Sequence, residues 1–149
     1  MNNSTKYPLL ISACLLGTPC RYDGSSKAMP TQTLELLQRT YHLIPVCPEE
    51  LGGLPTPRMP SEHVGNKVLM KTGKDVTAEF QKGAEVSLRI ALEAGCKAAL
   101  LKEHSPSCGH GEIYDGTFSG TLVPGNGCTA KLLLANGIQV FGESQVSEL

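Results

Sequence analysis

Six cysteines are the side chains of this 149-residue sequence with the clearest potential for chemistry. Their spacing includes no Cys-x-x-Cys pair and no His/Cys doublet of the zinc-finger type. A metal bound by these thiols must therefore be gathered by the fold from distant parts of the chain. The alternative is that they are small buried hydrophobic residues, which is common for cysteine. The six positions are Cys14, Cys20, Cys47, Cys96, Cys108 and Cys128.

The composition favours a cytoplasmic protein that acts on small molecules. No apolar run approaches the ~20 residues of a membrane-spanning helix, and the run before Cys14 is shorter than the core of an export signal. In a reducing compartment the cysteines are not expected to form disulfides. With 13 basic and 14 acidic residues, the formal charge is -1, so the chain lacks the basic surface that binds nucleic-acid polymers or membranes.

The elements that would position the thiols alternate between strands and helices. Short apolar runs predict four buried strands, at residues 9–15, 42–47, 98–101 and 138–141. Apolar residues at helical spacing predict three helices, within residues 31–41, 77–94 and 129–136. Residues 67–71 alternate and predict a small edge strand, whereas the Pro/Gly-rich stretches 48–66 and 103–112 predict loops. The pattern indicates one α/β domain over residues 1–149, with a mainly parallel, Rossmann-like sheet and helices on both faces.

Three cysteines fall where predicted strands end. Cys14 lies near the end of the first strand, Cys47 closes the second, and Cys108 lies in the loop after the third. Because ligands of open α/β sheets bind beyond the carboxyl ends of the strands, we expect these thiols at one edge. Cys96 precedes a strand and is expected in the core, at the opposite edge.

Spacing alone does not choose three ligands, because Cys20 and Cys128 lie in segments that could also approach this edge. Three thiolates suit zinc, cuprous copper or an iron–sulfur cluster. Three protein ligands to a cubane cluster would leave one iron open. An open iron can act as a Lewis acid toward a substrate heteroatom, and sulfur is the natural candidate.

Six motifs, in order along the chain, resemble those of the DUF523 family, which includes thiouracil desulfurases. They are SACLLG (12–17), RYDG (21–24), PVCPEE (45–50), GGLPTPR (52–58), Lys102 with SPSCG (105–109), and YDGTF (114–118). The resemblance implies a cytoplasmic [4Fe–4S] enzyme that removes sulfur from thiolated uracil bases or nucleotides without net electron transfer, giving uracil and sulfide.

The resemblance also assigns roles to residues. It carries the three cluster ligands onto Cys14, Cys47 and Cys108, and catalytic roles onto Glu49 and Ser105. Since Glu49 is two residues from Cys47, it is expected to act as general acid/base between the attacking water, the ring and the leaving sulfur. Ser105 is expected to orient the substrate or the water by a hydrogen bond.

Further polar residues in the same motifs are expected to bind substrate. Arg21, Arg58 and Lys102 could hold a substrate phosphate, because guanidinium and ammonium groups suit that charge. Asp23 and Ser107 are expected to make further contacts with the substrate. Each also has a structural interpretation, since Asp23 precedes a glycine and Ser107 follows a proline, as turn residues do.

Other classes stay open at this point. A zinc protein would use the three cysteines with His104, His110 or water, and would lack inorganic sulfide. A redox or sulfur-transfer protein would use a free thiolate as nucleophile. A non-enzymatic binder of small nucleotides has less support, because the sequence has neither a Gly-x-Gly-x-x-Gly motif after its first strand nor a Walker-type Gly-Lys-Ser/Thr.

Overall fold

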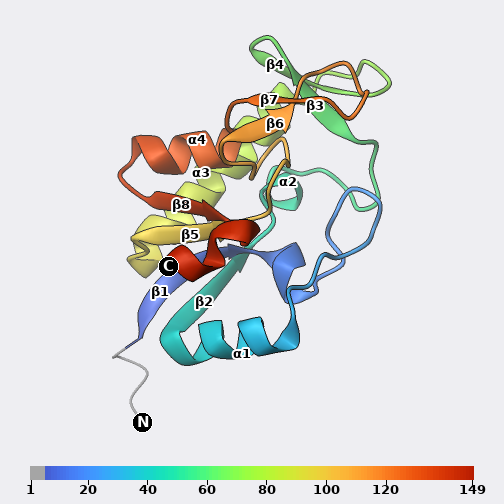
Figure 1. The fold of residues 1–149 in the computed structure, drawn as a ribbon. Coiled ribbons are helices and arrows are strands. Elements are labelled where there is room, and N and C mark those ends of the chain that lie inside the picture. Colours follow the sequence, from blue (N-terminus) through green and yellow to red (C-terminus); the bar gives the residue numbers. More distant parts are fainter. Residues whose placement is uncertain (1–5) are drawn as a thin grey trace.

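A parallel four-stranded sheet organises the computed structural model, which describes residues 6–149 (Figure 1). The strand order is β2-β1-β5-β8, and every neighbouring pair in this sheet is parallel. The bounds are β1 (Tyr7–Ser12), β2 (Tyr41–Val46), β5 (Ala98–Leu101) and β8 (Gln139–Gly142). The predicted α/β class with a parallel sheet is therefore confirmed. No helix of the described chain is long and apolar enough to cross a membrane.

Helices cover both faces of this sheet, as predicted. On one face, Leu9 and Ile11 of β1 pack with Leu37 of α1 (Thr31–Thr40). On the other face, Leu10 packs with residues of α3 (Thr77–Ala94) and α4 (Cys128–Ala135). Because successive side chains of a strand point to opposite faces, a continuous apolar run suits a strand that is covered on both sides.

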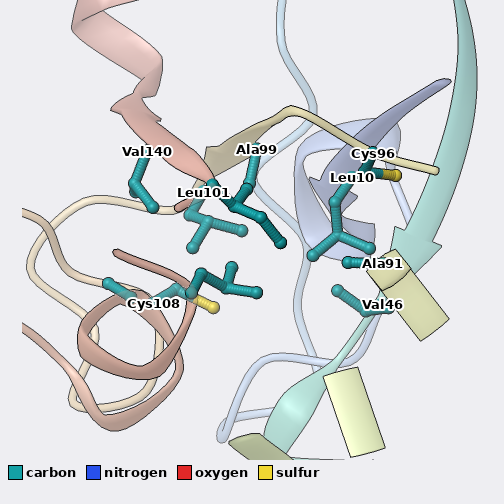
Figure 2. Packing of buried hydrophobic residues seen from close by; sticks show 11 residues of the cluster. Leu10, Val46, Ala91, Cys96, Ala99, Leu101, Cys108 and Val140 are labelled. Carbon is teal, nitrogen blue, oxygen red and sulfur yellow. The ribbon is translucent and has the colours of Figure 1, made fainter. Parts of the chain in front are cut away.

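The core reaches from the middle of the sheet to the carboxyl ends of its strands. Figure 2 shows Cys96 and Cys108 on opposite sides of a cluster that includes Leu10 and Leu101. Cys96, 4 % exposed, lies before β5 and packs as a core residue, as expected. Cys108 lies in the loop after β5 and belongs to the same apolar cluster. The apolar packing therefore extends to the carboxyl edge of the sheet, where the ligand is expected to bind.

Two short elements occupy the stretch 48–66, which the sequence predicted as a loop. They are the helical turn α2 (Pro48–Leu51) and the strand β3 (Ser61–Val64), so that prediction is wrong for these residues. α2 begins with a proline and lies tightly against α3: a Cβ at Gly83 would come within 1.9 Å of the Pro48 carbonyl oxygen. The contact between α2 and α3 therefore depends on the missing side chain of Gly83.

Two antiparallel hairpins lie beyond the sheet and form what we call the hairpin lobe (residues 60–71 and 112–124). One hairpin pairs β3 with β4 (Lys67–Met70), and the other pairs β6 (Glu112–Tyr114) with β7 (Leu122–Pro124). The four strands lie together at the top of Figure 1. The sequence predicted β4 alone. The lobe stands over the carboxyl edge of the sheet and closes one side of the site.

Candidate functional site

A cavity of about 360 Å³ lies between the carboxyl edge of the sheet and the hairpin lobe. This volume is within the ~300–1,000 Å³ range of small-molecule sites. Cys14 reaches the cavity from the 3₁₀ helix η2 (Ala13–Leu16) that follows β1, Cys47 from the end of β2, and Cys108 from the loop after β5. The structure thus brings together three thiols that are far apart in the sequence.

Backbone and side-chain hydrogen bonds fix the ends of the strands that present these thiols. The Lys102 backbone N–H donates to Ser12 Oγ (2.9 Å), which joins the ends of β1 and β5. η2 ends at Gly17, which has a φ of 103°, a conformation that glycine adopts without strain. The position of Cys14 therefore follows from the sheet and from this short turn.

All three thiols are free, and burial raises the pKa of each. The pKa of Cys14 rises to about 11, although the Lys102 ammonium opposes the increase. The pKa of Cys108 rises to about 12, although hydrogen bonds with Ser12 and Ser107 oppose that increase. Such thiols stay protonated near neutral pH until a cation replaces the proton.

The donor set fits a polynuclear centre held by sulfur. Within residues 6–149, no three His, Cys, Asp or Glu side chains are arranged to hold a single metal ion. The three thiols are instead distributed around a shared cavity. An iron–sulfur cluster takes one thiolate on each of several irons, so its ligands surround a volume. Cys14, Cys47 and Cys108 all line this cavity and supply sulfur ligands of the type that such a cluster needs.

The structure separates the two cysteines that the sequence left undecided. Cys20 is 4 % exposed and lines the cavity beside Cys47, whose Sγ lies 3.6 Å from the Cys20 carbonyl oxygen. Cys128 does not line the cavity, and it packs at the start of α4 against the apolar cluster around Phe80. Cys20 is therefore a fourth sulfur at the site, whereas Cys128 is a packing residue.

Glu49 is held by partners on both of its carboxylate oxygens. It lies in α2, lines the cavity and has a side chain that is 14 % exposed. Its Oε1 accepts a hydrogen bond from Arg58 Nε, and its Oε2 accepts one from Ser107 Oγ, each at 2.9 Å. These two contacts restrict the carboxylate to one orientation.

A pair of serines connects Glu49 to the cysteine loop. Ser105 Oγ accepts the backbone N–H groups of Ser107 and Cys108, both at 3.1 Å. It also lies 2.9 Å from Ser107 Oγ, which donates to Glu49. With its acceptor capacity used by the backbone, the Ser105 hydroxyl is oriented to donate. The hydroxyls and the carboxylate form a continuous hydrogen-bonded chain at the cavity wall.

Arg58 connects three loops around the cavity. Its side chain is 3 % exposed. Besides Glu49, its guanidinium donates to Thr56 Oγ1 (2.8 Å) and to the carbonyl oxygens of Cys20 (3.0 Å) and Pro55 (3.1 Å). Most of its donors are therefore engaged by the protein, and its main effect in the described structure is to fix Glu49.

The other candidate substrate contacts differ in their availability. Arg21 lines the cavity, and its guanidinium carbon lies 5.7 Å from the centre of the Tyr22 ring. Lys102 lines the cavity too and forms an ion pair with Glu143 (2.8 Å). Asp23 does not line the cavity; it accepts hydrogen bonds from Ser25, which lower the pKa of its carboxyl.

The hairpin lobe adds residues to the cavity that the sequence did not single out. They include Glu62, Lys71, Tyr114 and Phe118. The motif YDGTF contains the two aromatic residues, so it could have drawn attention to them. Glu62 and Lys71 carried no such signal, because their position over the site depends on how the two hairpins pair.

Fold and site together define an α/β protein with a thiol-lined ligand cavity at the carboxyl edge of a parallel sheet. The model of the 2-thiouracil desulfurase family matches residues 9–145, and the chain belongs to this family. This membership confirms the resemblance carried by the six motifs.

Two other proteins are similar to this chain over nearly its whole length. The chain is 40% identical over 151 residues to the uncharacterized protein YbbK of Bacillus subtilis (strain 168), covering 95% of this chain and 99% of YbbK. A solved structure of the [4Fe-4S]-dependent thiouracil desulfidase TudS (DUF523Vcz) is 51% identical and superposes with a TM-score of 0.93. That match covers 97% of this chain and 95% of the TudS chain.

Proposed function

We propose that this protein is an iron–sulfur-dependent desulfurase that converts a thiolated uracil and water to uracil and sulfide. The observation that carries the proposal is that Cys14, Cys47 and Cys108, each following a different strand, line one cavity together with Glu49. The 51% identity to a [4Fe-4S]-dependent thiouracil desulfidase supports the same conclusion. The free thiols suit the reducing cytoplasm, where we propose that the enzyme works.

The three cysteines would hold a [4Fe–4S] cluster through their thiolates. When bound, a cluster with three protein ligands supplies a Lewis-acidic iron for the thiocarbonyl sulfur of the substrate. Cys20 lies beside Cys47 and has no assigned role as a ligand. Cys14 and Cys47 adjoin strands of the sheet, and the backbone N–H of Cys108 is held by Ser105 Oγ, so the site needs little rearrangement to receive the group.

Glu49 would act as the general acid/base. As a carboxylate it takes a proton from the water that attacks the ring carbon, and it returns a proton to the ring or the departing sulfur. Arg58 and Ser107 keep it in one orientation before the substrate arrives. In the described structure the Ser105 hydroxyl donates to Ser107 Oγ and so supports the orientation of Glu49; rotation of this hydroxyl away from Ser107 would let it donate to the substrate or the water. Positioned groups of this kind contribute more than mobile ones because they need no reorganisation during the reaction.

The substrate would be a small thiolated pyrimidine, either the free base or a nucleotide. Arg21 and Lys102 line the cavity and would meet a substrate phosphate. Arg58 and Ser107 would act through their contacts with Glu49, whereas Asp23 lies outside the cavity lining and bonds to Ser25 instead. The formal charge of -1 agrees with a small-molecule partner rather than a nucleic-acid polymer or a membrane.

The test is anaerobic reconstitution with iron and sulfide, followed by an assay of uracil and sulfide release from 2-thiouracil and 4-thiouracil. We expect stoichiometric release of both products from at least one substrate. A protein fully loaded with iron and acid-labile sulfide that releases neither product would overturn the proposal. A colourless protein that binds zinc and resists cluster loading would favour the zinc alternative.

A further inference from the structure

The hairpin lobe places a second carboxylate, Glu62 of β3, in the wall of the same cavity. Glu62 is only 8 % exposed. Its Oε1 accepts two backbone hydrogen bonds from the loop between β6 and β7, from Gly116 N–H (2.9 Å) and Phe118 N–H (3.1 Å). The loop approaches closely, since a Cβ at Gly116 would lie 2.5 Å from the His63 carbonyl oxygen. One oxygen of Glu62 is therefore fixed in place.

The second oxygen of Glu62 has no partner. Within the described part of the chain, Oε2 accepts no hydrogen bond, and no Lys, Arg or His forms an ion pair with Glu62. Nor is Oε2 among the buried atoms that are cut off from solvent without a partner. Glu62 lines the cavity, so its open oxygen is available to a ligand bound there.

The contrast with Glu49 makes this arrangement unusual for a structural carboxylate. Glu49 has a cation on one oxygen and a hydroxyl on the other. Glu62 is more buried, yet it lacks both a cation and a partner for Oε2. Burying a carboxylate is unfavourable unless it is paired or fully hydrogen-bonded, so a buried carboxylate with an open oxygen in a cavity wall is a candidate for binding a ligand.

We propose that Glu62 Oε2 accepts a hydrogen bond from the ring N3–H of the thiolated uracil and thereby selects bases that carry a proton at this position. The proposal rests on the proposed function, which supplies the substrate class. N3–H is adjacent to the thiocarbonyl group in both 2-thiouracil and 4-thiouracil, so a single carboxylate serves either isomer. Glu62 is a specificity-determining residue in this scheme, separate from the acid/base role of Glu49.

The two backbone donors make Glu62→Gln an informative substitution. A glutamine amide can accept from Gly116 and Phe118 through its carbonyl oxygen alone, because its NH₂ group has no acceptor capacity. The loop contact is therefore kept, and the NH₂ group takes the place of Oε2. The open position changes from an acceptor to a donor while the fold is preserved.

The experiment compares 2-thiouracil, which has N3–H, with 2-thiocytosine, whose N3 accepts a hydrogen bond. For each base, kcat/KM is measured with the anaerobically reconstituted wild-type and Glu62→Gln enzymes. Where 2-thiocytosine is not turned over, its competitive inhibition constant replaces kcat/KM. The two bases also differ at C4, which carries an oxygen in 2-thiouracil and an amino group in 2-thiocytosine. This difference is the same for both enzymes. A change in the ratio of the two kcat/KM values between wild type and Glu62→Gln therefore reports on residue 62. Iron content and thermal unfolding are recorded for each protein, with the exposed lobe variant Glu112→Gln as the matched control.

We expect Glu62→Gln to lower kcat/KM for 2-thiouracil by about tenfold or more, mainly through KM, because a hydrogen bond to a charged group is lost. We expect the affinity for 2-thiocytosine to rise, so the ratio between the two bases falls by more than tenfold. Glu112→Gln should leave the ratio unchanged.

An unchanged ratio in Glu62→Gln, with iron content and 2-thiouracil turnover intact, would show that Glu62 only anchors the loop. The proposal would then fail while the proposed function stands. If the loaded wild-type enzyme desulfurates no thiopyrimidine, the proposed function fails first and the role of Glu62 fails with it. The wild-type assay with 2-thiouracil distinguishes the two cases.

Discussion

The edge of the parallel sheet and the hairpin lobe form opposite walls of one cavity, and they are built differently. The edge belongs to a sheet whose two central strands, β1 and β5, are buried over residues 9–12 and 99–101, and it supplies the thiols. The lobe consists of two-stranded hairpins of three or four residues a strand, and it supplies Glu62, Tyr114 and Phe118. The difference suggests a division of labour in which the rigid wall holds the cluster and the acid/base groups, while the lobe recognises the base.

The largest expected effect tests the rigid wall. Replacing Cys14, Cys47 or Cys108 singly with alanine would remove one of the three proposed protein ligands, so we expect loss of most bound iron and of all measurable turnover. Iron and acid-labile sulfide analysis of the anaerobically purified proteins measures the first effect. Cys96→Ala and Cys128→Ala, which replace packing cysteines, are the matched controls and should keep the cluster. Full iron content in Cys47→Ala would remove Cys47 from the ligand set.

A second substitution in the same wall separates chemistry from cluster binding. Glu49→Gln keeps the size of the side chain but removes its basicity, so we expect kcat to fall by about 10²–10⁴-fold. Iron content should not change. Glu50→Gln, in the next residue of α2 and outside the cavity lining, is the control. Turnover within a factor of three of wild type in Glu49→Gln would argue against the acid/base role.

The close contact between Gly83 of α3 and Pro48 of α2 predicts that a larger side chain at residue 83 lowers the stability of the protein. Gly83→Ala places a methyl group where the Pro48 carbonyl lies, and we expect a loss of about 1–3 kcal/mol in the free energy of unfolding, as for other overpacked sites. Denaturant unfolding of the two proteins measures it. Glu85→Ala, on the exposed side of α3, should be close to wild type. An equally stable Gly83→Ala protein would show that α2 can shift away from α3 without cost.

The smallest expected effect belongs to the lobe. Phe118 lines the cavity and is also held by Glu62 through its backbone, so Phe118→Ala removes an aromatic surface but keeps the loop contact. We expect KM to rise roughly tenfold, with iron content and kcat nearly unchanged. The control is Val123→Ala, at an exposed position on β7. A loss of iron in Phe118→Ala would contradict the proposed division between the two walls.

The sequence predicted the rigid wall because its signals are local. Each strand of the parallel sheet is a short apolar run. Cys14 and Cys47 lie at the ends of two of these runs, and Cys108 lies in the loop that follows a third. Once the strands are parallel, their carboxyl ends must meet at one edge. The α/β class, the helices on both faces and the shared edge therefore followed from residue pattern without knowledge of strand order.

The lobe could not be predicted in the same way. Its strands have three or four residues each, and β6 pairs with β7 across a loop, so no window of the sequence shows a clear period of two. The prolines of residues 48–66 suggested a loop although the segment contains β3. Glu62 lines the cavity through contacts with Gly116 and Phe118, which are more than fifty residues away. Its environment is a property of the tertiary structure.

The order of the cysteines along the chain has a consequence for biogenesis. Since the three thiols follow β1, β2 and β5, no short segment of a nascent polypeptide carries the whole site. With the three proposed ligands, cluster insertion would wait until β5 has joined the sheet beside β1, so maturation would follow folding. The inserted cluster would then cross-link three separate segments of the chain, and we expect the mature protein to resist heat and proteases better than the apoprotein.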